Sequence, residues 1–176
     1  LFFPNNATLV VVGAVRAESL LPKLESSFGS WKPGQALSST ERTASQVRER
    51  AIYLVDKPGA PQSEIRVGQI GASRLVDDYF TLVTLNTILG GSFTSRLNSN
   101  LRENHGYTYG AGSSFGFRLW PGPFTIFTAV QTEVTDKALA EILKELEAIR
   151  QPIPAEELER GKNYVALRFP ARFQSV

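Results

Sequence analysis

The order of sequence periodicities from residue 50 onward constrains the fold of this 176-residue chain more than any other feature. Two strand-like runs come first, and two helical stretches follow them. A second pair of strand-like runs and a second pair of helical stretches then complete the order. Runs of strands alternating with runs of helices are typical of α+β domains. The sequence therefore predicts an α+β, two-layer sandwich, in which helices pack on one face of a mostly antiparallel sheet.

The strands are predicted from apolar, β-branched runs that end at turn residues. The predicted strands are 7–12, 51–56, 63–71 and the two runs on either side of Trp120-Pro121-Gly122. The last two runs are rich in aromatic residues, which could form a platform for stacking a ligand. We interpret them as sheet core, because aromatic side chains in strands more often pack there.

The helices are predicted where apolar residues recur at three- and four-residue steps. The stretch 77–89 is apolar on most faces, so we expect it to be well buried. Asp77 or Asp78 suits its N-cap, and Gly90 suits its C-terminal end. The predicted helices are 17–28, 77–89, 93–104, 136–149 and a last helix that starts at Glu156 and Glu157.

The polar stretch over 36–49 divides the chain into two parts. It is rich in Ser, Thr and Arg and follows a Pro-Gly pair, which is typical of a linker. Residues 1–35 then read as a strand-helix tail of a preceding domain. Residues 50–176 read as a second domain, truncated within its last helix. Because the chain starts at Leu1 without a methionine, we expect it to be a piece of a longer protein.

Composition excludes several classes of function. The net charge is +2, and the 19 basic and 17 acidic residues are mixed, so nothing indicates binding to nucleic acid or to an anionic membrane. The absence of cysteine excludes disulfides and thiolate metal sites. No apolar run approaches the roughly 20 residues that span a bilayer. We expect a soluble chain of unknown location, periplasmic or cytoplasmic if it is bacterial.

Residues 90–109, GGSFTSRLNSNLRENHGYTY, form the stretch that looks like a functional site. Arg102 lies in its helical segment, and Tyr109 follows seven residues later at the start of a strand. An arginine keeps its charge and presents forked donors to a carbonyl, and a phenol donates one more. This helix-to-strand corner is therefore predicted to hold a peptide carbonyl. Tyr107 is the alternative, because it shares a strand face with Tyr109.

Other residues of this stretch carry ordinary interpretations. His105 is the only histidine, and nothing around it completes the three ligands that zinc needs, so we expect no metal site and no catalytic residue in this chain. Gly90 and Gly91 lack the frame of a phosphate loop and predict a close backbone approach at a tight turn. Arg96 is interpreted as a surface or interdomain ion-pair residue. Arg102 itself could be a solvated helix residue.

Several strings resemble the pitrilysin/insulinase-type zinc metallopeptidases, the inverzincins that include the mitochondrial processing peptidases and the core subunits of a respiratory cytochrome complex. The strongest match is DDYFTLVTLNTILGGSFTSRLNSNLRENHGYTYGAGSSF. IYLVDKPGAPQSEIRVGQIG resembles the opening hairpin of a domain, and AEELERGKNYVA resembles a later helix. NATLVVVGAV with FGSWKPG resembles the end of a preceding, related domain.

The resemblance implies two related halves or subunits. One half binds zinc through H-x-x-E-H and a distant glutamate. The other half lacks zinc and contributes an arginine and a tyrosine that hold the substrate, which correspond here to Arg102 and Tyr109. The chain would then be the non-zinc-binding segment of a zinc-dependent endopeptidase, inactive alone, with peptide substrates and a zinc-bearing domain or subunit as partners. The alternatives are a non-catalytic structural or assembly subunit and an autonomous peptide-binding module.

Overall fold

The computed structural model of the chain describes residues 2–35 and 44–173. The chain divides into two compact units, Leu1–Glu41 with Ala171–Val176 and Arg42–Pro170. The predicted linker over 36–49 lies largely outside the described residues, which resume at 44.

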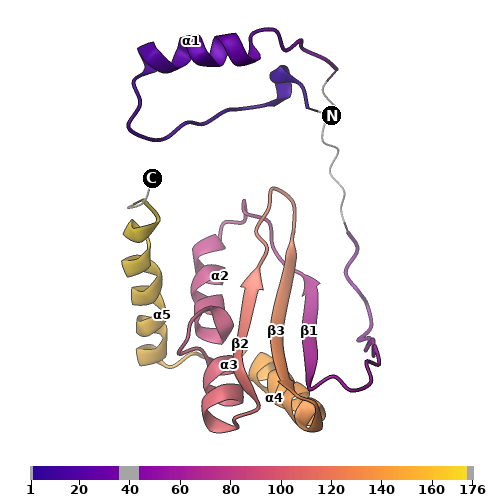
Figure 1. Cartoon of the computed structure of the whole chain (residues 1–176). Coiled ribbons are helices and arrows are strands. Elements are labelled where there is room, and N and C mark those ends of the chain that lie inside the picture. Colours follow the sequence, from indigo (N-terminus) through magenta and orange to yellow (C-terminus); the bar gives the residue numbers. More distant parts are fainter. Residues whose placement is uncertain (1, 36–43, 174–176) are drawn as a thin grey trace. The chain divides into compact units, whose positions relative to one another are not determined.

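In the smaller unit, α1 over Ala17–Phe28 confirms the predicted helix (Figure 1). The strand predicted over 7–12 is wrong. This run forms no strand, and Val10 and Val12 are 77% and 71% exposed. A strand needs a neighbour for its backbone N–H and C=O groups, and none pairs with this run in the described part of the unit.

The larger unit is built on a three-stranded antiparallel sheet in the order β1-β3-β2 (Figure 1). The strands are β1 at Gln62–Ile70, β2 at Thr108–Phe115 and β3 at Pro123–Gln131. These bounds confirm the predicted strand over 63–71 and the predicted antiparallel pair around Trp120-Pro121-Gly122. β3 is the central strand, so both of its edges are hydrogen-bonded within the sheet.

The strand predicted over 51–56 is wrong. These residues follow an irregular path, and Ile52, Tyr53, Leu54 and Val55 are all at least 77% exposed. Their β-branched and aromatic side chains favour a strand, but β-propensity depends on neighbouring strands and on burial. No described strand lies against this run, so its backbone has no hydrogen-bonding neighbour and its β-propensity does not lead to a strand.

The helices of the larger unit confirm the predicted order. Two of them continue into π-helical segments, η2 and η3, which begin where α2 and α3 end. The helical elements are α2 at Tyr79–Asn86, η2 at Thr87–Gly91, α3 at Arg96–Asn98, η3 at Ser99–Asn104, the short 3-10 helix η4 at Thr132–Val134, α4 at Thr135–Ala148 and α5 at Ala155–Arg168.

The core lies between the helices and one face of the sheet. Along β3 the side chains alternate, with Ile126 and Val130 fully buried and Phe127 44% exposed on the opposite face. Helical residues complete the core, among them Leu89, Leu97, Leu101 and Ile142. Because the helices cover one face of the sheet, the predicted two-layer α+β sandwich is confirmed. The interpretation of the aromatic residues as core holds for Phe124, which is 7% exposed, but not for Phe127.

The stretch predicted to be well buried over 77–89 is buried only in its second half. α2 contains no buried residue, and Phe80 is 64% exposed, whereas Thr87 to Gly90 in η2 are all buried. Asp78 occupies the N-cap position without making a capping hydrogen bond. The buried residues of η2 therefore attach the continuous helical stretch formed by α2 and η2 to the sheet.

Gly90 explains why η2 can approach β2 so closely. A Cβ atom at Gly90 would lie 2.5 Å from the Ser113 backbone nitrogen, so any side chain here would collide with the strand. Asn86 reinforces the contact, because its Nδ2 donates to the Ser113 carbonyl at 3.2 Å and its Oδ1 accepts from the Ser113 hydroxyl at 2.9 Å. The close backbone approach predicted for the glycine pair is confirmed at Gly90.

Arg96 joins α3 to α5 inside the larger unit. Its Nε and Nη2 donate to the two carboxylate oxygens of Glu157 at 2.7 and 2.6 Å. Both side chains are largely shielded, with exposed fractions of 17% and 18%. The hydrogen bonds from Arg96 lower the pKa of Glu157 below its ordinary value. The expected ion pair of Arg96 is thus present, but it is neither at the surface nor between units.

Candidate functional site

The predicted site is built at the corner between η3 and β2 (Figure 1). The helix ends where Gly106 adopts a left-handed backbone with φ of +64°, a conformation that glycine adopts at little cost. The amide of Gly106 donates to the Arg102 carbonyl at 3.1 Å, and the amide of Tyr107 donates to the Leu101 carbonyl at 2.9 Å. These bonds reverse the chain within a few residues and lead it directly into β2.

Arg102 sits near the end of η3 with its side chain 34% exposed. Its Cζ lies over the ring of Phe93, 4.4 Å from the ring centroid. Its Nη1 lies 3.1 Å from Glu103 Oε1, in an ion pair. That nitrogen is shielded from solvent and has no hydrogen-bond partner of good geometry in the described part of the chain. The guanidinium of Arg102 is therefore held in place at this corner by Phe93 and Glu103.

Tyr109 lies at the start of β2 and is 92% exposed. The pairing of β2 with β3 is irregular between Thr108 and Ala111, where the register shifts. Such irregularities bend a strand and re-aim its side chains. Tyr109 makes no hydrogen bond or ring contact with the residues that the structure describes, so its phenol is open to a partner.

The two candidate tyrosines have different surroundings in the structure. Tyr107 is half-buried, packs against the core and stacks on His105 with ring centroids 4.9 Å apart. Tyr109 projects into solvent from the strand. No hydrogen bond or cation–π contact joins Arg102 to Tyr109 within the described ranges, so the structure brings their elements together but not their side chains.

Asn98 connects the elements that carry these residues, and sequence reasoning missed it. Its Nδ2 donates to the Phe93 carbonyl at 2.6 Å, and its Oδ1 accepts from the Ala111 amide at 3.2 Å. It is 4% exposed. One signal was available in the sequence: asparagine is a poor helix former, so an asparagine inside an amphipathic helix often has a specific hydrogen-bonding role.

The residues present do not fit a zinc site. Within 2–35 and 44–173, no group of three or more His, Cys, Asp or Glu side chains could hold a metal ion. His105 is exposed and stacks on an aromatic ring instead. Among the same residues, no helix is both long and apolar enough to cross a membrane.

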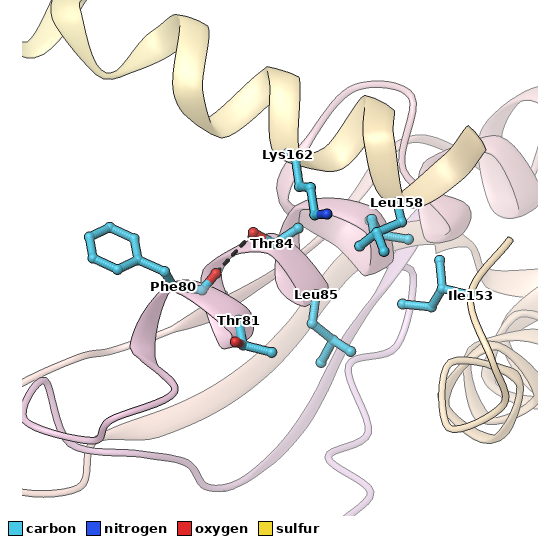
Figure 2. A pocket seen from close by; sticks show the side chains of 8 residues that line it. Phe80, Thr81, Thr84, Leu85, Ile153, Leu158 and Lys162 are labelled. Carbon is cyan, nitrogen blue, oxygen red and sulfur yellow. Dashed lines mark hydrogen bonds between the residues drawn. The ribbon is translucent and has the colours of Figure 1, made fainter. Parts of the chain in front are cut away.

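An apolar pocket of about 400 Å³ lies apart from this corner, between α2 and α5 (Figure 2). Leu85, Leu158 and Lys162 are among the residues that line it. The only dashed contact in this view is internal to α2, from the Thr84 hydroxyl to the Phe80 carbonyl at 2.9 Å. The pocket contains neither Arg102 nor Tyr109, so it is separate from the predicted site.

Comparison with known proteins gives consistent results for sequence and fold. The family model described as peptidase M16 inactive domain matches residues 1–165. The chain is 27% identical over 168 residues to the uncharacterized zinc protease YmxG of Bacillus subtilis, and 25% identical over 162 residues to an uncharacterized zinc protease of Rickettsia bellii. Each alignment covers 92% of this chain but 38% of the relative.

Solved structures show the same fold. The peptidase M16 inactive domain from Pseudomonas fluorescens superposes with a TM-score of 0.73 and 28% identity, covering 86% of this chain and 37% of that one. A protease from Helicobacter pylori gives a TM-score of 0.75 at 19% identity, covering 93% and 40%. The predicted resemblance and fold class are confirmed, and the chain belongs to the peptidase M16 inactive-domain family.

Proposed function

We propose that this chain is the non-zinc-binding segment of a longer zinc peptidase, in which Arg102 and Tyr109 hold the backbone of a peptide substrate. The observation that carries the proposal is the Arg102 guanidinium, whose side chain is 34% exposed and which is held over the Phe93 ring and beside Glu103 at the corner that leads into β2. A guanidinium has more N–H donors than the pair with Glu103 uses, so Arg102 can also donate to a substrate carbonyl.

The two side chains would act by donating hydrogen bonds. A guanidinium keeps its positive charge at any working pH, so it interacts more strongly with an oxygen that gains negative charge during peptide hydrolysis. The phenol of Tyr109 adds a neutral donor. Since removing one donor to such a developing negative charge typically costs about 2.7 to 4 kcal/mol, losing Arg102 should lower turnover about 100- to 1,000-fold.

The longer protein supplies the remaining parts in this proposal. Zinc is bound outside this segment, by a homologous domain or subunit that faces the corner carrying Arg102. Residues 1–35 are proposed to be the end of a preceding related domain, with 36–49 as the linker and 50–176 as the inactive-type domain. Two relatives named as zinc proteases, each more than twice as long as the matched region, support this arrangement.

Peptide hydrolysis by the longer protein tests the proposal. Arg102→Ala and Tyr109→Phe should each lower kcat/KM for an unstructured peptide, while the bound zinc measured by atomic absorption stays at the parental level. Tyr107→Phe is the matched control, and it should leave kcat/KM unchanged. Parental rates in both Arg102→Ala and Tyr109→Phe would contradict the assigned roles. A parental protein that binds no zinc and cleaves no peptide would favour the structural or assembly subunit.

A further inference from the structure

We infer that Phe93 is a positioning residue whose ring holds the Arg102 guanidinium in its substrate-binding orientation. The inference rests on the proposed function of Arg102 and adds a residue to that site. Phe93 lies outside the regular helix, in the short connection between η2 and α3, and it is 68% exposed. A large apolar side chain left this open contributes little to the core, so its contact with Arg102 suggests a role outside core packing.

The contact between the two side chains is a cation–π interaction. The Arg102 Cζ lies 4.4 Å from the centroid of the Phe93 ring, well within the roughly 6 Å over which such an interaction is attractive. A guanidinium stacked over a ring keeps its N–H donors available, because these donors lie in its own plane. Phe93 can therefore fix the orientation of Arg102 without using any donor that the substrate needs.

The remaining contact of the guanidinium is consistent with this role. Glu103 lies beside Nη1 at 3.1 Å, but its side chain is 57% exposed, so solvent weakens the pair. The same nitrogen lacks a hydrogen bond of good geometry in the residues that the structure describes. A carboxylate bound through two hydrogen bonds, as Glu157 is bound by Arg96, would instead compete with a substrate carbonyl.

Asn98 fixes Phe93 relative to the strand that carries Tyr109. The amide group of this buried residue bonds the Phe93 carbonyl on one side and the Ala111 amide on the other, at 2.6 and 3.2 Å. Ala111 lies two residues after Tyr109 in β2. Through these hydrogen bonds, the Asn98 side chain connects the segment that carries Phe93 to β2, and Asn98 itself lies four residues before Arg102 in the same helical stretch.

A double-mutant cycle in the longer, zinc-containing peptidase tests the inference. Phe93→Leu removes the aromatic ring and keeps an apolar side chain, and Phe93→Tyr keeps a ring. We expect Phe93→Leu to lower kcat/KM about three- to tenfold, and Phe93→Tyr to stay within about twofold of the parental value. In the Arg102→Ala background, Phe93→Leu should have no further effect. Equal losses in the two Phe93 variants, or a full loss in the Arg102→Ala background, would overturn the inference.

A second measurement separates the inference from the proposed function. The side-chain Nε–H resonance of Arg102 in the full chain should be shifted by the ring current of Phe93, and Phe93→Leu should abolish that shift. If Arg102→Ala leaves hydrolysis unchanged, the proposed function fails, and the resonance still reports whether Phe93 positions Arg102. If Arg102→Ala lowers hydrolysis but Phe93→Leu changes neither rate nor resonance, the inference alone fails.

Discussion

Replacing Glu157 by Gln should destabilise the larger unit by about 2 to 3 kcal/mol. The carboxylate accepts two hydrogen bonds from Arg96, at 2.7 and 2.6 Å, and both side chains are more than four-fifths shielded. Gln can accept one of these bonds, but it leaves the guanidinium without its counter-charge. Hydrogen bonds to charged groups contribute about 1.5 to 3 kcal/mol each, and breaking a fully buried pair costs about 3 to 5 kcal/mol. Because both side chains are partly exposed, we expect a cost at or just below the lower end of the range for a fully buried pair.

Urea unfolding followed by circular dichroism measures this effect. With a slope of about 2 kcal/mol per molar urea, the expected loss lowers the midpoint by about 1 to 1.5 M. Glu156→Gln is the matched control, because Glu156 shares the first turn of α5 but forms an exposed pair with Arg160. That control should cost less than about 0.5 kcal/mol. Equal midpoints for the two variants would refute the reasoning that shielding makes the Arg96–Glu157 pair important.

Three further predictions concern stability. Hydrogen bonds from Arg96 lower the pKa of Glu157 from its ordinary value of 4.5, so the pair contributes its full stability above about pH 4.5 and loses it as pH falls through the lower folded-state pKa. The difference in unfolding free energy between the parent and Glu157→Gln should therefore shrink as the pH of the unfolding measurement is lowered. Gly90→Ala, whose Cβ would lie 2.5 Å from the Ser113 nitrogen, should cost about 1 to 3 kcal/mol in urea unfolding, and no loss would contradict the close approach. Gly106→Ala, at φ +64° with open space around it, should cost about 1 to 2 kcal/mol, and Gly106→Asn clearly less.

The helices could be predicted well because their signal is local. The stretch 136–149 places apolar residues on one stripe, and α4 forms at Thr135–Ala148 with Ile142 buried. The strand runs were predicted less well, since 7–12 and 51–56 have strong β-propensity but no neighbouring strand in the described chain. A strand is completed by its hydrogen-bonding neighbour, which a local pattern does not identify.

The candidate site could be predicted only in part. The sequence predicts that Arg102 and Tyr109 lie on either side of a helix-to-strand corner, and the structure has this corner between η3 and β2. The contact that supports Arg102 cannot be predicted from the sequence pattern, because it depends on where the connection that carries Phe93 lies relative to η3. The bond from Asn98 to the Ala111 amide likewise depends on how α3 packs against β2.

The claim that Arg102 and Tyr109 hold the peptide is tested most directly by binding in the absence of cleavage. The longer protein, stripped of zinc by a chelator, would be titrated calorimetrically with an unstructured peptide substrate. The account predicts that Arg102→Ala weakens the Kd at least tenfold and Tyr109→Phe about two- to tenfold, whereas Tyr107→Phe leaves it unchanged. A Kd that stays at the parental value in both Arg102→Ala and Tyr109→Phe would contradict it.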